Sequence, residues 1–172
     1  NPNVAIANGI GMVHQHFMLV EDFTVTQNII LGNETTSHAG VVDMKRARKQ
    51  ILEIVEKYGL EVDPDAKVND ISVGMQQRVE ILKALYRGAE LLILDEPTAV
   101  LTPQEIEDLL SIMHNLVNDG KAIIIITHKL KEIKASSDTC TIIRRGEYID
   151  TISVKEVSEQ ELATLMVGHE VK

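Results

Sequence analysis

The sequence has few of the features that stabilise secreted domains or anchor proteins in membranes. It contains one cysteine, Cys140, among 172 residues, so no disulfide can form within the chain. Cys140 lies in the alternating segment 139–143, which predicts a buried strand residue in a protein from a reducing compartment. No signal peptide opens the sequence, and no apolar run approaches the roughly twenty residues of a membrane-spanning helix. If a membrane is involved, we expect the chain to touch it only through another protein.

Positive charge is also scarce. The formal net charge is −9, with 25% of the residues charged, and the longest basic run is the segment 45–49. A surface that binds nucleic acid needs clustered Lys and Arg to neutralise phosphates. The composition therefore predicts no nucleic-acid partner, and the length suits one domain or slightly less than one.

The most informative segment is an apolar run that ends in two adjacent carboxylates. Residues 91–94 are large aliphatics, and Asp95, Glu96 and Pro97 follow them. The run predicts a strand buried on both faces, as in a parallel sheet, and Pro97 ends the strand because it has no N–H for the ladder. Both carboxylates then lie at the carboxyl end of a strand, where open α/β sheets bind ligands. Nucleotide hydrolases build a metal-and-water site in this way, although an isolated Asp-Glu pair can equally be solvated residues that close a strand.

Three further motifs accompany this strand. The segment 71–78 is Ile-Ser-Val-Gly-Met-Gln-Gln-Arg, the segment 123–128 is four isoleucines followed by Thr and His, and the segment 9–15 ends in His-Gln. With the Leu-Asp-Glu-Pro strand between them, they resemble the ATP-binding domain of ABC transporters, whose signature usually contains Leu-Ser-Gly-Gly-Gln. The four motifs stand in the family's order, and the resemblance covers nearly all of the chain.

The resemblance implies roles for four residues. Asp95 is expected to hold Mg²⁺ through a water, and Glu96 to act as the general base or to orient the attacking water. His128, at the carboxyl end of a strand, is expected to hydrogen-bond the γ-phosphate of ATP and the attacking water. Gln15 is expected to contact the metal and sense the nucleotide. Without the other motifs, His128 would be interpreted as a hydrogen-bonded histidine at a strand edge. For Gln15 the alternative is a polar loop residue.

The signature segment is expected to bind phosphate from the other side. By resemblance, Ser72 and Gly74 contact the γ-phosphate of an ATP that is held mainly by a second ATP-binding domain, and a helix N-terminus favours such an anion. Two positions depart from the family. Val73 replaces the first signature Gly and Met75 replaces the Gln, which puts in doubt how closely the backbone approaches the phosphate.

One motif of the resembled family is missing. A phosphate-binding Gly-x-x-x-x-Gly-Lys-[Ser/Thr] loop occurs nowhere in the 172 residues, and the family places it before the glutamine loop. We therefore expect a chain that begins inside the domain and lacks its first strands and its phosphate loop. By itself such a chain is predicted neither to bind ATP tightly nor to hydrolyse it.

The patterns predict an α/β, P-loop NTPase-like fold with a mainly parallel sheet flanked by helices and an inserted helical subdomain. A strand that leads into a loop is predicted over residues 6–15. Further strands are predicted over 91–96 and 122–127, with two more joined at 145–146. Five helices are predicted to begin at capping residues, namely Thr24, Asp43, Ser72, Thr102 and Ser158. A further helix is predicted over residues 130–135. In the partial ATP-binding domain 1–172, residues from about 16 to 88 form the helical signature lobe, and those from about 89 to 172 form the α/β part.

The segments 14–20, 97–103 and 165–168 resemble importer ATPases for simple sugars and nucleosides. The family implies ATP and Mg²⁺ as cofactors, a peripheral location at the cytoplasmic face of the cell membrane, and three partners. These are transmembrane permease subunits, a second ATP-binding domain and, indirectly, a solute-binding protein. Phe17 and Phe23 are expected to contact the permease, unless they pack inward. A soluble non-transport ABC ATPase and a catalytically inactive interaction module are the alternative functions.

Overall fold

The computed structural model describes residues 1–14, 16–31 and 43–169. The chain forms two units, residues 1–126 and 127–172, which are described separately. The expected residue Gln15 lies outside the described residues.

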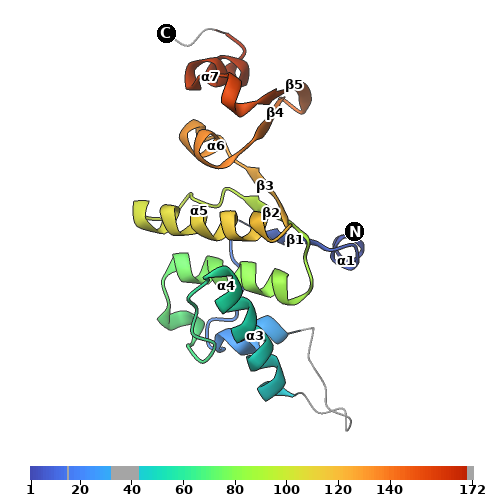
Figure 1. The fold of residues 1–172 in the computed structure, drawn as a ribbon, viewed down its shortest axis with the longest axis vertical. Coiled ribbons are helices and arrows are strands. Elements are labelled where there is room, and N and C mark those ends of the chain that lie inside the picture. The colour runs from blue at the N-terminus through green and yellow to red at the C-terminus, as the bar shows by residue number, and fades with distance from the viewer. Residues whose placement is uncertain (15, 32–42, 170–172) are drawn as a thin grey trace. The chain divides into compact units, whose positions relative to one another are not determined.

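The first unit combines helices with a small parallel sheet (Figure 1). Its elements, in chain order, are α1 Pro2–Ala7, β1 Ile10–Val13, α2 Val25–Ile30, α3 Met44–Tyr58, the 3-10 turn η1 Val68–Asp70, α4 Val73–Tyr86, β2 Leu91–Asp95, α5 Pro103–Asn118 and β3 Ala122–Ile126. The strands lie in the order β1-β2-β3, and both pairings are parallel. The predicted parallel sheet is therefore confirmed.

Strand β1 begins later than predicted. The segment 6–15, predicted as a strand that leads into a loop, starts with the end of helix α1, which the sequence patterns did not indicate. Asn1 caps this helix by accepting a hydrogen bond from the Asn3 N–H at 3.0 Å, and Pro2 stands in its first turn. Gly9 then adopts φ +80°, a conformation that glycine takes without steric cost, and β1 begins at Ile10.

The two faces of the sheet differ in burial, because α4 and α5 pack on only one of them. Leu92 and Leu94 are buried in the core that these helices share with the sheet. Successive strand residues point to opposite faces of a sheet. On the other face, Met12 and Ile124 are each paired with Ile93 of the central strand, and they are 42% and 50% exposed. Leu91 and Ile93, on this second face, are half-buried. The prediction that the strand is buried on both faces is therefore wrong for the described residues.

Local capping signals place the helices where the sequence predicts them. Thr24 and Thr102 each form a capping box with the residue three positions on, and Asp43 caps α3 through the Arg46 N–H. Helix α3 ends at Gly59, whose φ of +69° is a left-handed cap. Between residues 16 and 88 the described chain contributes only helices, turns and one isolated bridge. The division of the chain into lobes near residue 88 remains a prediction.

The second unit is a hairpin packed with two helices. Its elements are α6 Leu130–Ser136, β4 Thr139–Arg144, β5 Glu147–Ser153, the 3-10 turn η2 Val154–Glu156 and α7 Glu159–Val167. Strands β4 and β5 pair antiparallel, and Ile133, Val154 and Leu162 form the core. Cys140 lies in a strand, as predicted, but it is only half-buried, and this burial raises the pKa of its thiol.

Candidate functional site

Helix α4 begins at the expected serine. The Oγ atom of Ser72 accepts a hydrogen bond from the Met75 N–H at 3.2 Å and so caps the helix. Ser72 is exposed, and Val73, the first helical residue, is 45% exposed. The valine that departs from the family pattern therefore occupies an ordinary position in the first helical turn.

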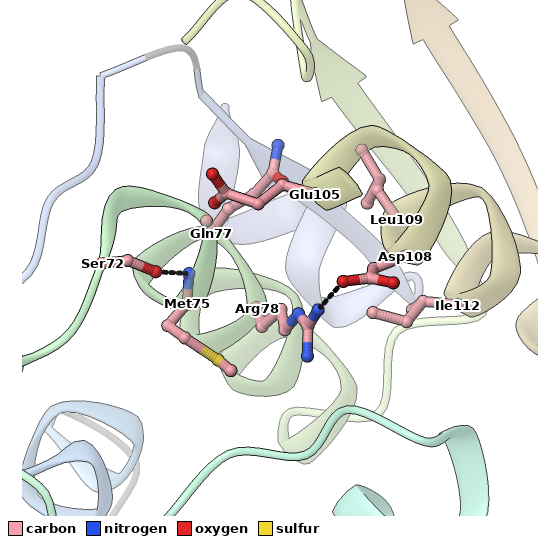
Figure 2. A pocket seen from close by; sticks show the side chains of 9 residues that line it. Ser72, Met75, Gln77, Arg78, Glu105, Asp108, Leu109 and Ile112 are labelled. Carbon is pink, nitrogen blue, oxygen red and sulfur yellow. Dashed lines mark hydrogen bonds and ion pairs between the residues drawn. The ribbon is translucent and has the colours of Figure 1, made fainter. Parts of the chain in front are cut away.

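Gly74 is buried and lies beside Glu105 of helix α5. Glu105 lines the same pocket as Ser72 and Gln77 of helix α4 (Figure 2). The carboxylate of Glu105 lies where a Cβ on Gly74 would be, so any side chain at this position overlaps it. The Glu105 carboxylate therefore fills the space beside the glycine, and the expected contact of Gly74 with a phosphate stays a prediction. A cavity of about 110 Å³ lies between these helices, and Arg78 and Asp108 line it and form an ion pair at 3.3 Å.

Asp95 and Glu96 lie at the carboxyl end of strand β2, as predicted. Asp95 is the last strand residue and pairs with Ile126 of β3. The Glu96 N–H donates to the carbonyl of Ile126 at 2.8 Å, which extends the pairing by one residue. Both carboxylate residues are half-buried. Two acidic side chains therefore lie next to each other at the edge where parallel sheets bind ligands.

The backbone changes direction at Glu96, which has φ +46°. A non-glycine residue with positive φ is uncommon and persists where its surroundings hold it. The next residue, Pro97, is buried, and Thr98 is 5% exposed. Glu96 is therefore carried by a turn that is anchored in the protein interior.

The described residues of the expected site are divided between the two units. Asp95, Glu96, Ser72 and Gly74 belong to the first unit, whereas His128 belongs to the second. His128 follows the end of strand β3 by two residues and is exposed. Its proposed proximity to the phosphates therefore stays a prediction, as does the role of Gln15.

Sequence reasoning missed three buried polar residues on helix α4. These are Gln77, Arg78 and Glu80, each at most 9% exposed. Arg78 donates to the carbonyl of Leu60 at 2.9 Å, and the Gln77 side chain donates to the carbonyl of Pro97. A signal exists in the sequence, because the apolar residues of this helix occupy more than one face, so that the polar residues between them cannot all reach solvent.

Glu80 is held in an environment that disfavours its charge. Burial raises the pKa of the Glu80 carboxyl, while Lys83, the Met18 N–H, His14 and Arg87 act in the opposite direction. One oxygen of this carboxylate has no hydrogen-bond partner.

Comparisons with known proteins agree with the fold and the motif order. Residues 3–99 match the model of the ABC transporter family. The chain is 63% identical over 171 residues to the nucleoside import ATP-binding protein NupA of Lactococcus lactis, covering 99% of this chain and 34% of that protein. It is 60% identical over 171 residues to the guanosine import ATP-binding protein NupO of Bacillus subtilis, covering 99% of this chain and 33% of that protein.

A solved structure gives the same result for the fold. The cbiO1 protein of Clostridium perfringens, part of an ABC transporter complex, has a TM-score of 0.73 and 26% identity, covering 94% of this chain and 62% of that chain. The predicted α/β fold class, that of the P-loop NTPases, is confirmed. The chain spans about a third of the length of the curated relatives that it matches.

Proposed function

Because the chain belongs to the ABC transporter family, we propose that it forms part of the ATP-hydrolysing subunit of an importer for nucleosides or simple sugars. The observation that carries this proposal is 63% identity over 99% of the chain to a nucleoside import ATP-binding protein. Both relatives described above are import proteins by name, and neither supports the soluble non-transport ATPase. Nucleosides are therefore the first substrates to test.

In this proposal Asp95 and Glu96 form the hydrolytic site. Among the described residues no group of three or more His, Cys, Asp and Glu side chains is placed to hold a metal. Mg²⁺ in nucleotide hydrolases suits such a sparse site, because one or two carboxylates and the substrate phosphates are its usual ligands. Asp95 is the residue that would hold the metal, which when bound neutralises charge on the phosphates.

Glu96 is proposed to take the proton of the attacking water. Its half-buried carboxylate stands one residue beyond Asp95, so the two side chains divide the roles of metal ligand and base. His128 and Gln15 are proposed to orient the same water and the γ-phosphate. Phosphoryl transfer demands mainly positioning and charge neutralisation. These four side chains are proposed to supply the positioning, and the metal that Asp95 would hold supplies the positive charge.

Ser72 and Gly74 are proposed to serve a second nucleotide. The hydroxyl of Ser72 is exposed at the start of the 14-residue helix α4, where the aligned peptide dipoles favour an anion. The corresponding partner is a second ATP-binding domain, whose ATP the signature residues contact.

The remaining partners follow from the importer function. We propose transmembrane permease subunits as direct partners, a solute-binding protein as an indirect one, and a peripheral place at the cytoplasmic face of the membrane. No helix in the described part of the chain is long and apolar enough to cross a membrane. The 172-residue chain alone is proposed to be inactive, because its sequence contains no phosphate loop.

A hybrid protein tests the hydrolytic function. In the Lactococcus lactis relative, the aligned segment is replaced by this chain, so that the rest of that protein completes the domain. We expect the hybrid to hydrolyse ATP and to support nucleoside uptake, and Glu96→Gln to abolish turnover while ATP still binds, because an amide cannot accept the proton. Near-normal turnover by this variant would remove Glu96 from the role of base.

Calorimetry tests the proposed inactivity of the chain alone. We expect no measurable heat when Mg-ATP is titrated into the 172-residue chain, and the hybrid is the positive control. Micromolar affinity, about −8 kcal/mol, would contradict the proposal.

A further inference from the structure

The turn that carries Glu96 has a conformation that its own sequence does not favour. Glu96 has φ +46° and is followed by Pro97. A side chain with a Cβ adopts this left-handed conformation only where neighbouring contacts hold it. Contacts on either side of Glu96 therefore help to hold the backbone from which its carboxylate projects.

Two hydrogen bonds flank this residue. On one side the Glu96 N–H donates to the Ile126 carbonyl of strand β3 at 2.8 Å. On the other side the side-chain amide of Gln77 donates to the Pro97 carbonyl. Gln77 is 3% exposed, so no water competes for this carbonyl from the side of the helix. This side-chain amide joins helix α4 to the turn, which also has a hydrogen bond of its own from the Ala99 N–H to the Glu96 carbonyl at 3.3 Å.

Gln77 is itself rigidly placed. It lies in helix α4, five residues after Ser72, which caps that helix. Its neighbour Arg78 is fixed at both ends of its guanidinium group, to the Leu60 carbonyl and to Asp108 of helix α5. Because Gln77 donates to the Pro97 carbonyl, the helix that begins at the signature serine contacts the turn that carries Glu96.

We propose that Gln77 is a positioning residue for hydrolysis, which holds Glu96 in its active orientation and links it to the signature helix of the same chain. This inference rests on the proposed role of Glu96. Glutamine suits the task because its amide is a neutral donor long enough to reach the carbonyl. A side chain of the same length without a donor leaves a buried carbonyl unpaired and frees the turn.

The first test measures the turn in the 172-residue chain itself, without nucleotide. In Gln77→Met we expect the amide of Glu96 to exchange with deuterium at least tenfold faster, while the amide of Leu94 in strand β2 keeps its rate. The matched control is Gln76→Met, because Gln76 is on the same helix but donates to the carbonyls of Val68 and Ile71. Unchanged exchange at Glu96 in Gln77→Met would overturn the proposal.

A second variant covers a loss of folding. If Gln77→Met unfolds, Gln77→Asn replaces it. Its side chain keeps an amide that is one methylene too short to reach the Pro97 carbonyl, and deuterium exchange at the Glu96 amide is measured again. If both variants unfold, Gln77 is a general stability residue, and the positioning role is wrong.

The second test measures turnover in the hybrid described above. We expect Gln77→Met to lower kcat for ATP hydrolysis at least tenfold with KM for ATP within twofold, and Gln76→Met to change neither. If the parent hybrid is active and Gln77→Met keeps its kcat, the inference fails while the proposed function stands. If the parent hybrid is inactive, the proposed function fails, and hydrogen exchange at Glu96 still decides whether Gln77 holds the turn.

Discussion

The carboxylate of Glu105 occupies the space beside Gly74 that a side chain there would need. Glu105 also closes the capping box at the start of helix α5, where its other oxygen accepts the Thr102 N–H at 3.3 Å. The signature glycine and the cap of the following helix therefore form one packed contact. The Glu105 oxygen that faces Gly74 is buried without a hydrogen-bond partner.

We predict that Gly74→Ala destabilises the chain by about 1 kcal/mol, because the added methyl group overlaps the Glu105 carboxylate, which must move away and lose its hydrogen bond to the Thr102 N–H. Thermal unfolding measures the loss. Val73→Ala is the control, since Val73 is exposed in the same helical turn. A Glu105→Ala background should reduce the cost of Gly74→Ala, and a cost that is equal in both backgrounds would show that the two residues are not coupled.

The behaviour of Glu80 with pH gives a second prediction. A glutamate in an unfolded chain titrates near pH 4.3, and burial raises its pKa in the folded protein. The contribution of Glu80 to the free energy of unfolding is therefore fully present below about pH 4.3 and is lost as the pH rises through the folded pKa. We expect Glu80→Gln to raise the melting temperature relative to the original chain at pH 7 and to leave it nearly unchanged at pH 4.

Glu53 provides the control for this experiment, because it is exposed on helix α3. Glu53→Gln removes the same charge without removing a buried group. An equal gain in melting temperature from both substitutions at pH 7 would mean that net charge, not the burial of Glu80, is responsible.

The sequence predicted the elements whose signals are local. Asp43 marks the start of helix α3 by accepting a hydrogen bond from the Arg46 N–H, and Gly59 marks its end by its left-handed φ angle. Thr102 marks the start of α5 by its capping box. The carboxylates at the end of β2 were predicted because an aliphatic run followed by Pro97 allows few alternatives.

The features that sequence did not predict depend on contacts between distant segments. Gln77 becomes a buried donor only because Pro97, twenty residues away, offers a carbonyl. Similarly, the burial of Gly74 depends on Glu105 from another helix. Helix α1 was missed because its cap comes from Asn1 and its end from the φ angle of Gly9, which are weak signals in so short a segment.

One face of the sheet β1-β2-β3 is largely uncovered, and we therefore predict that the 172-residue chain self-associates. Met12, Ile124 and Ile126 are 42%, 50% and 48% exposed on one face, and in the described part of the chain β3 pairs on one edge only. Exposed apolar faces and unpaired edges both favour association. We expect sedimentation at millimolar protein to show oligomers, and Ile124→Lys to reduce them. Val117→Lys, on an exposed position of helix α5, adds the same charge elsewhere and should leave them, whereas a monomeric parent chain would refute the prediction.

The last prediction concerns the proposed contact with a permease, for which Phe17 and Phe23 were the expected anchors. Phe17 is half-buried, whereas Phe23 is 38% exposed although its backbone is fixed by hydrogen bonds to Val20 and Val68. An exposed aromatic ring on a fixed backbone is typical of an interface anchor. In the hybrid we expect Phe23→Asp to abolish nucleoside uptake and to weaken copurification with the permease, while ATP hydrolysis by the purified subunit and its melting temperature stay nearly unchanged.

Leu19→Asp is the contrasting variant, because Leu19 packs against the core and a buried unpaired carboxylate costs several kcal/mol. A fall in melting temperature with Phe23→Asp as large as that with Leu19→Asp would assign Phe23 to the core and exclude it from the interface.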